Sequence, residues 1–186
     1  KGDYQRAMNL LDGVRSVFVG QAKAQNIAYY RAFCSYNMKD YQIASDLFKQ
    51  FIQTYPESSF AEECLYMMGF CDYKASPKPR LDQQVTEKAI REFQLYLSRY
   101  PYSMRKDKVN TYMDEMRDKL SYKAYLSAKN YYLREHYKAA VISLQNCLKD
   151  YPGSKYREEI MYMLFVSKYQ MAVNSVEDKK VERYNN

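Results

Sequence analysis

Side chains that could perform catalysis or bind a metal are scarce in this 186-residue sequence. His136 is the only histidine, and we expect it to lie in a turn. Zinc sites built on a histidine pair are therefore excluded. The five glycines are too far apart for a phosphate-binding loop or a dinucleotide fingerprint. The acid pairs Asp114–Glu115 and Glu158–Glu159 have no nucleophile and base beside them. The sequence predicts no enzyme activity, no cofactor and no metal.

Four cysteines are present, at positions 34, 64, 71 and 147. In a helix Cys64 and Cys71 would be two turns apart, about 10 Å, which is too far for a disulfide bond. We expect all four to be small buried side chains. Metal or redox chemistry is the alternative interpretation.

Tyrosines recur in pairs seven residues apart, a spacing that places both rings on one face of a helix. The pairs are Tyr29/Tyr36, Tyr66/Tyr73, Tyr125/Tyr132 and Tyr162/Tyr169, with Phe33, Phe70 and Val166 between three of them. Such rings could line a peptide-binding groove, because tyrosine provides a large contact area at a low entropic cost. They could equally pack neighbouring helices together. The candidate protein-binding residues of this kind are Tyr29, Phe33, Tyr36, Tyr66, Phe70 and Tyr73.

The net charge of +7 arises in the middle of the chain, where residues 74–138 carry fifteen Lys/Arg and eight Asp/Glu. Five of these cations are further candidates for protein binding, namely Lys78, Arg80, Arg105, Lys106 and Lys108. We interpret them as one basic cluster that could dock on an acidic partner surface or an anionic membrane. A solvated helix face is the alternative. No nucleic-acid-binding module is recognisable, so no nucleic-acid partner is expected.

A proline-containing segment, 76–82, separates two expected helices in this basic region. A long insertion in a repeat protein can mark a binding site. It could also be a spacer that resets the stacking of the repeats.

The elements that must position these residues come from an internal repeat. Tyr41-Gln-Ile-Ala44 returns as Tyr137-Lys-Ala-Ala140, and Tyr-Pro occurs at positions 55, 100 and 151. Apolar residues at helical spacing follow each repeat start, and Tyr-Pro should end that helix. The serine after each Tyr-Pro is expected to cap the next helix.

Each repeat reads as a helical hairpin that cannot bury its apolar face alone, so hairpins must stack. The Ala-x3-Phe pattern followed by Pro, at Ala44, Phe48 and Pro56, matches the second half of the tetratricopeptide (TPR) signature. We therefore predict an all-α, TPR-like superhelical solenoid. Its hairpin elements are expected at about 1–20, 23–56, 59–101, 104–152 and 155–186, incomplete at both ends. The segment 104–134 lacks Gly and Pro and should be one long helix shared by two hairpins.

From Phe51 onward the residues resemble a specific family. The segments that carry this resemblance are Tyr55-Pro-Glu-Ser58, Tyr66-Met-Met-Gly-Phe70, Leu81-Asp-Gln83, Ala89-Ile-Arg-Glu-Phe93, Arg99-Tyr-Pro-Tyr-Ser103, Leu120 through Tyr137 and Asp150-Tyr-Pro-Gly-Ser154. Their order is similar to that of the BamD family, the TPR lipoproteins of the outer-membrane β-barrel assembly machinery. The resemblance covers about residues 2–175, and the richness in tyrosine and lysine is similar to Bacteroidetes-type members.

The resemblance implies a scaffold at the periplasmic face of the outer membrane, held by an N-terminal lipid anchor outside this sequence. The implied partners are the periplasmic domains of the barrel-forming subunit, other assembly lipoproteins and unfolded β-barrel precursors. The resemblance implies membrane contact only through this anchor. Separately, no apolar run in the sequence is long enough to span a bilayer. Two alternatives are a soluble periplasmic TPR coordinator of cell-envelope processes and the TPR interaction region of a larger protein.

Overall fold

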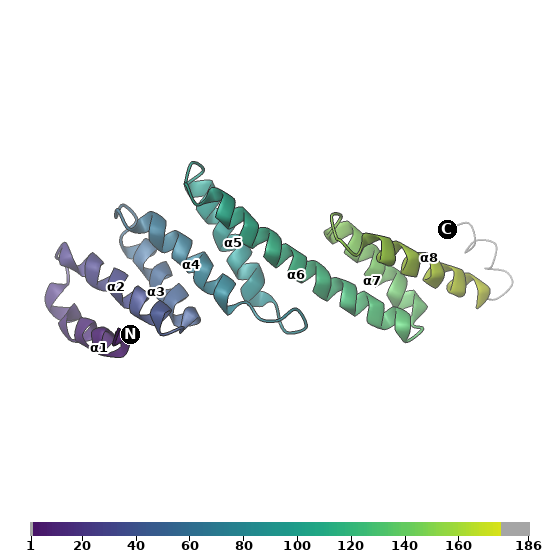
Figure 1. Ribbon diagram of the computed structural model, residues 1–186, viewed down its shortest axis with the longest axis horizontal. Helices are drawn as coiled ribbons and strands as arrows, with labels where there is room; N and C mark the ends of the chain where they lie inside the picture. The colour runs from purple at the N-terminus through teal and green to yellow at the C-terminus, as the bar shows by residue number, and fades with distance from the viewer. Residues whose placement is uncertain (1, 176–186) are drawn as a thin grey trace. The chain divides into compact units, whose positions relative to one another are not determined.

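The computed structural model describes residues 2–175, which form helices joined by short turns (Figure 1). The elements are α1 (Tyr4–Arg15), the short 3-10 helix η1 (Ser16–Phe18), α2 (Lys23–Asn37), α3 (Tyr41–Thr54), α4 (Ala61–Ala75), α5 (Gln84–Arg99), α6 (Lys106–Leu133), α7 (Tyr137–Asp150) and α8 (Arg157–Val173). The predicted all-helical, TPR-like fold class is confirmed. The expected further helix start at Glu182–Asn186 lies outside the described residues.

Two compact units divide the chain, unit 1 at residues 1–116 and unit 2 at residues 117–186. In unit 1, Phe48, Phe51, Phe93 and Tyr96 are buried in the core. Unit 2 has its own core around Leu144, in helix α7, and α8 packs on that helix. No helix in the described part is long and apolar enough to cross a membrane. The arrangement of hairpins as one solenoid stays a prediction.

The second helix of each hairpin has the predicted apolar face. Ala44 and Phe48 of α3 are fully buried, as are Ala140 and Leu144 at the same positions of α7. Each of these helices ends at the tyrosine before proline, which has an extended φ of −130° at Tyr55, −126° at Tyr100 and −131° at Tyr151. The ring of the following proline disfavours a helical conformation there, so the Tyr-Pro stop is confirmed.

The predicted serine caps are wrong in detail. The hydroxyls of Ser58, Ser103 and Ser154 accept hydrogen bonds from the amides two residues later, at 3.2–3.3 Å. These amides belong to the turn, and each helix begins only after it. The serines therefore stabilise the turns, because a short hydroxyl side chain reaches a nearby amide most readily.

Helices α2 and α6 end in the same type of turn. Lys39 and Glu135 have left-handed φ angles of 69° and 60°. The next amide in each case, that of Asp40 or His136, bonds back five residues, as in a Schellman motif. His136 is the residue before helix α7, which confirms its expected place in a turn. The expected long helix is also present as α6, with 28 residues.

Candidate partner-binding surface

Six aromatic side chains of unit 1 form a continuous series of ring contacts across α2, α4 and the first part of α6. We call Tyr29, Phe33, Tyr36, Phe70, Tyr73 and Tyr112 the aromatic row. Ring centroids are 4.6 Å apart for Tyr29–Phe33, 6.4 Å for Phe33–Tyr36, 6.2 Å for Tyr36–Phe70, 5.9 Å for Phe70–Tyr73 and 4.5 Å for Tyr73–Tyr112. All six side chains are half-buried, so each ring packs against the core and still faces solvent.

Five of the six predicted aromatic residues belong to this row, and the sixth, Tyr66, touches the row but differs from it in burial. Tyr66 is buried, with 7% of its surface exposed. Its ring stacks on Phe70 at 5.7 Å and also contacts Tyr96 of α5. Tyr66 therefore packs neighbouring helices together. The half-buried rings of the row also pack against the core, but one part of each ring is accessible to solvent.

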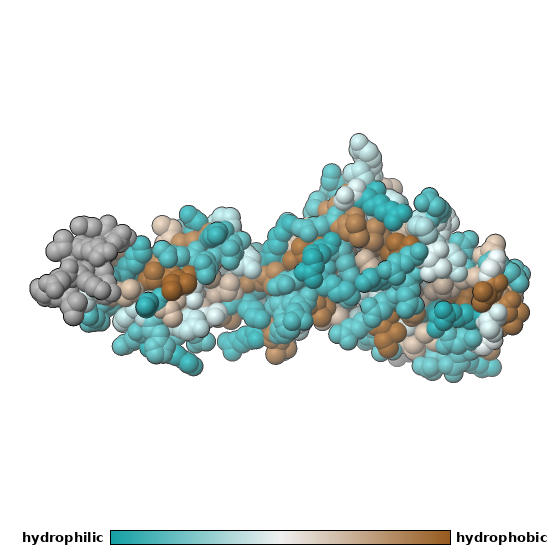
Figure 2. Space-filling model, turned by 180° about the vertical axis from the view of Figure 1, so that it is seen from behind, coloured by the Kyte–Doolittle hydropathy of each residue, from teal (hydrophilic) through white to brown (hydrophobic). Residues whose placement is uncertain are grey.

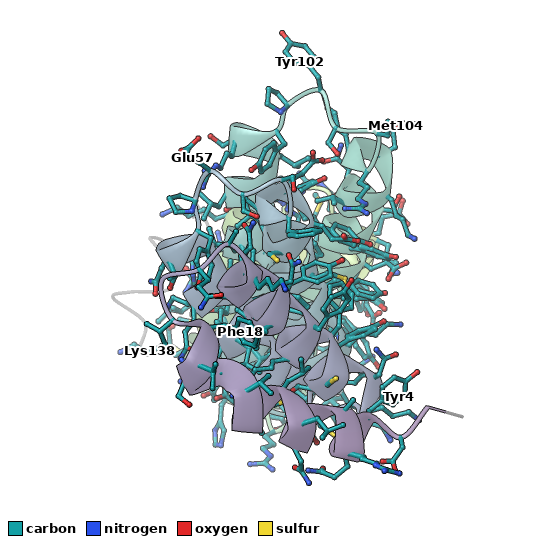
Figure 3. All side chains as sticks on the ribbon, turned by 90° about the vertical axis from the view of Figure 1, so that its left-hand side faces the viewer. Tyr4, Phe18, Glu57, Tyr102, Met104 and Lys138 are labelled. Atoms are coloured by element: carbon teal, nitrogen blue, oxygen red, sulfur yellow. The ribbon has the colours of Figure 1, made fainter. Side chains whose placement is uncertain are left out.

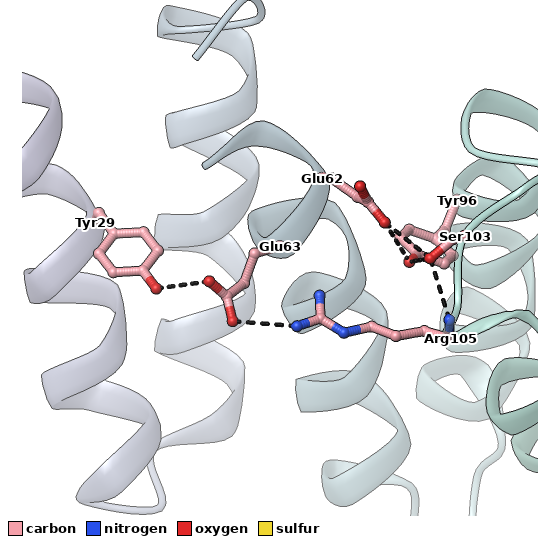
Figure 4. Close-up of polar contacts among 6 residues, drawn as sticks. All are labelled: Tyr29, Glu62, Glu63, Tyr96, Ser103 and Arg105. Carbon is pink, nitrogen blue, oxygen red and sulfur yellow. Dashed lines mark hydrogen bonds and ion pairs between the residues drawn. The ribbon is translucent and has the colours of Figure 1, made fainter. Parts of the chain in front are cut away.

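Two hydroxyl groups of the row donate to carboxylates on the next hairpin. Tyr29 donates to Glu63 of α4 at 2.7 Å (Figure 4), and Tyr73 donates to Glu115 of α6 at 2.5 Å. Partial burial, followed by the bond to Glu115, raises the pKa of Tyr73 to about 12. Burial and the bond to Glu63 also raise the pKa of Tyr29. Both phenols are neutral donors at any physiological pH.

Cations lie over the faces of Tyr66 and of two rings of the aromatic row. The guanidinium of Arg105 is 4.7 Å from the centroid of Tyr66, and its Nη2 lies 3.4 Å from Glu63 Oε1 (Figure 4). Lys108 lies 5.9 Å from the Tyr112 ring, and Lys74 lies 5.2 Å from the Phe70 ring. Cations attract the negative face of an aromatic ring, which places positive charge along the row.

The predicted basic cluster is wrong, because its members lie at opposite ends of α5. Lys78 and Arg80 belong to the α4–α5 loop, which precedes that helix. Arg105, Lys106 and Lys108 follow it, in the α5–α6 turn and the first turn of α6. A helix of 16 residues is about 24 Å long, so the two groups form separate sites.

Sequence reasoning missed Tyr112, which is the last ring of the row, and Lys74, which lies beside Phe70. Tyr112 lies outside the pairs seven residues apart, because α6 carries the extra residues that change the repeat spacing. Tyr112 follows Lys108 by four residues on α6, and this spacing indicates that the two side chains lie on the same face of the helix.

The α4–α5 loop is held by hydrogen bonds of its own. Gln83 is buried, and its amide nitrogen donates to the carbonyls of Lys78 and Leu81 at 2.8 and 3.1 Å. Its Oε1 accepts from the Thr86 hydroxyl at 2.8 Å. These bonds hold the loop in a defined conformation, and its role as a binding site or a spacer stays a prediction.

Unit 2 repeats part of this pattern. Tyr125 is buried and donates to Glu159 of α8 at 2.7 Å, and Lys129 bonds the same carboxylate at 2.7 Å. On α8 itself, Tyr162 and Tyr169 are 64% and 51% exposed. Their counterparts in α4 are less exposed, since Tyr66 is buried and Tyr73 is half-buried.

The described residues contain no group of three or more His, Cys, Asp or Glu side chains that could hold a metal ion. All four cysteines are buried with free thiols, as expected. Burial is the main cause that raises the pKa of Cys64 and of Cys71 to about 12. Their thiols stay protonated and are poor nucleophiles.

The sequence of this chain is similar to those of known outer-membrane proteins. The YfiO family model, described as an outer membrane lipoprotein, matches residues 1–183. The chain is also similar to the outer membrane protein assembly factor BamD of Pasteurella multocida (strain Pm70), with 25% identity over 188 residues. That alignment covers 96% of this chain and 72% of the relative.

Proposed function

Because the chain belongs to the YfiO family of outer membrane lipoproteins, we propose that it is a non-catalytic scaffold for outer-membrane protein assembly. It docks the periplasmic domains of the barrel-forming subunit and assists the insertion of β-barrel precursors. It acts at the periplasmic face of the outer membrane, held there by a lipid anchor. Binding requires no chemistry, only a complementary surface.

The observation that supports a binding role is the aromatic row. Half-buried tyrosine and phenylalanine rings are rigid, and they have already lost most of their conformational freedom, so little entropy is lost on binding. Lys74 and Lys108 stand beside the rings and can attract carboxylates of a partner. The row therefore suits a partner segment that combines apolar and acidic side chains.

The test compares two pairs of charge reversals. Lys74→Glu with Lys108→Glu alters the edge of the aromatic row, and Lys78→Glu with Arg80→Glu alters the α4–α5 loop. We expect the first pair to weaken binding to the purified periplasmic domains of the barrel-forming subunit by about tenfold, because both charges lie beside the contact. The second pair should change the dissociation constant less than about twofold.

Circular dichroism of all variants must show unchanged helix content for the comparison to hold. Equal binding of both variant pairs and the parent would overturn the assignment of the row. Loss of binding in the Lys78/Arg80 pair alone would instead move the docking site to the α4–α5 loop.

A further inference from the structure

Three Tyr-Pro turns of the chain share one backbone design. In each, the serine amide donates to the carbonyl of the tyrosine three residues earlier, at 3.2 Å for Ser58–Tyr55, 3.2 Å for Ser103–Tyr100 and 3.0 Å for Ser154–Tyr151. The first residue of the following helix then donates to the serine carbonyl at 2.9–3.1 Å. Because the three turns share these backbone hydrogen bonds, a difference in their side chains is not required by the backbone of the turn.

The three turns differ at the two positions flanking the serine. The α3–α4 turn has Glu57 and Ser59 there, and the α7–α8 turn has Gly153 and Lys155. The α5–α6 turn alone has two large side chains with apolar surface, Tyr102 and Met104. Its backbone does not require them, because the same turn forms with small or charged residues.

Both side chains are fully solvent-exposed, with relative accessibilities of 97% for Tyr102 and 103% for Met104. Figure 3 shows Tyr102 pointing away from the helices at the outer end of the turn, with Met104 beside it. In the space-filling view the same turn is a pale projection from the surface of unit 1 (Figure 2). Within residues 2–175, the Tyr102 side chain makes no ring contact and no hydrogen bond.

The residues that flank this tip are mostly basic. Arg99, Arg105, Lys106 and Lys108 stand against one acid, Asp107, within residues 99–108. Arg99 donates to the Pro56 carbonyl at 3.1 Å and Arg105 to Glu63, so both have partners inside unit 1. Lys106 is exposed and forms no ion pair within the described residues.

We propose that the α5–α6 turn contacts an anionic lipid surface through Tyr102 and Met104. Tyrosine suits the boundary between water and lipid, because its ring is apolar and its hydroxyl is polar. Each nearby Lys or Arg adds attraction to anionic headgroups, about 1 kcal/mol per charge near the surface. A specific protein interface buries roughly 1,200–2,000 Å², far more than two side chains at a loop tip provide.

Tyr102 and Met104 do not belong to the aromatic row, although Lys108 lies beside a ring of that row and close to this turn in the sequence. The proposed lipid contact goes beyond the scaffold role. The resemblance to the BamD family implies membrane contact only through a lipid anchor. A second, weak contact would hold the turn near the membrane surface, because two attachments are needed for stable anchoring when each one is marginal.

The experiment uses the absence of tryptophan in the chain. Tyr102→Trp introduces a single indole at the tip, and Tyr162→Trp, at an exposed site on α8, is its matched control. On vesicles of phosphatidylglycerol and phosphatidylcholine, the fluorescence of the first variant should shift to shorter wavelength, whereas the second should not shift. Vesicles of phosphatidylcholine alone should produce a smaller shift, because they lack the anionic attraction.

Binding is measured in parallel by vesicle co-sedimentation. The graft Tyr102→Glu with Met104→Ser copies the α3–α4 turn and should keep the fold while lowering vesicle binding by about tenfold. Lys106→Gln should lower it by about fivefold. Unshifted emission from the Tyr102→Trp variant on anionic vesicles, or unimpaired binding of the graft, would overturn the proposal. A shift that appears only with the barrel-forming subunit would show a protein contact and would also overturn it.

Discussion

Tyr29 in helix α2 donates its hydroxyl to Oε2 of Glu63 in helix α4 at 2.7 Å. Tyr125 in α6 forms the same bond to Glu159 in α8, also at 2.7 Å, and in both cases the partners are 34 residues apart. This separation equals the length of a TPR repeat. The bond therefore joins equivalent helices of neighbouring hairpins, and the repeat in the sequence becomes a repeat of stabilising contacts.

Tyr29→Phe should lower the free energy of unfolding of unit 1 by about 1 kcal/mol, because it removes a hydrogen bond to a half-exposed carboxylate and keeps the ring. Urea unfolding followed by circular dichroism measures the change. Tyr30→Phe is the matched control, since the exposed Tyr30 hydroxyl makes no hydrogen bond within the described residues. Equal stability of the two variants would mean that the Tyr29–Glu63 bond contributes nothing.

Gly69 and Gly13 should respond to alanine in opposite directions. A Cβ at Gly69 would lie 2.9 Å from the Phe93 ring, whereas a Cβ at Gly13 has no neighbouring atom within 4 Å. Gly69→Ala should therefore destabilise unit 1 by about 1–3 kcal/mol through overpacking. Gly13→Ala should stabilise α1 by about 0.5–1 kcal/mol, because alanine restricts the unfolded chain.

Thermal unfolding of the two glycine variants provides the measurement. A Gly69 variant as stable as the parent would show that Phe93 can move aside. Since Phe93 is fully buried in the core between α4 and α5, we expect it to resist such movement.

Glu92 should make the stability of unit 1 depend on pH. Its side chain is 11% exposed, and Lys88 Nζ lies 3.7 Å from Glu92 Oε1 and 2.9 Å from Asp72 Oδ2. Burial, followed by the interaction with Asp72, raises the pKa of Glu92 to about 8. The folded state therefore favours the neutral acid. The stability that this preference contributes is complete below about pH 4.5 and is lost as the pH rises through 8.

Glu92→Gln keeps a neutral side chain of the same shape at every pH. Its stability relative to the parent should increase between pH 5 and pH 9, by on the order of 1–3 kcal/mol. Denaturant unfolding at several pH values measures this difference. Glu87→Gln, on the exposed face of the same helix, is the matched control. A flat difference for Glu92→Gln would mean that Glu92 is already ionised at low pH.

The sequence was sufficient to predict the helices, the Tyr-Pro stops and the long helix α6. These features depend on local rules: the 3.6-residue periodicity, the fixed φ of proline and its effect on the residue before it. The serine caps were mispredicted because a serine hydroxyl can accept a hydrogen bond either from an amide of the turn or from an amide of the helix that follows. The choice between the turn and the first helical amide depends on the final turn geometry.

For the candidate surface, the sequence alone determined which residue types recur and that they share helix faces. Only the tertiary structure decided that Tyr66 is buried while Tyr29 and Tyr73 remain half-exposed, because burial depends on which neighbouring helix covers each ring. It likewise decided that Lys78 and Arg80 lie apart from Arg105 and Lys106, which the sequence analysis had grouped. Proximity in sequence becomes proximity in space only when no rigid helix intervenes, and here the 16 residues of α5 separate the two groups.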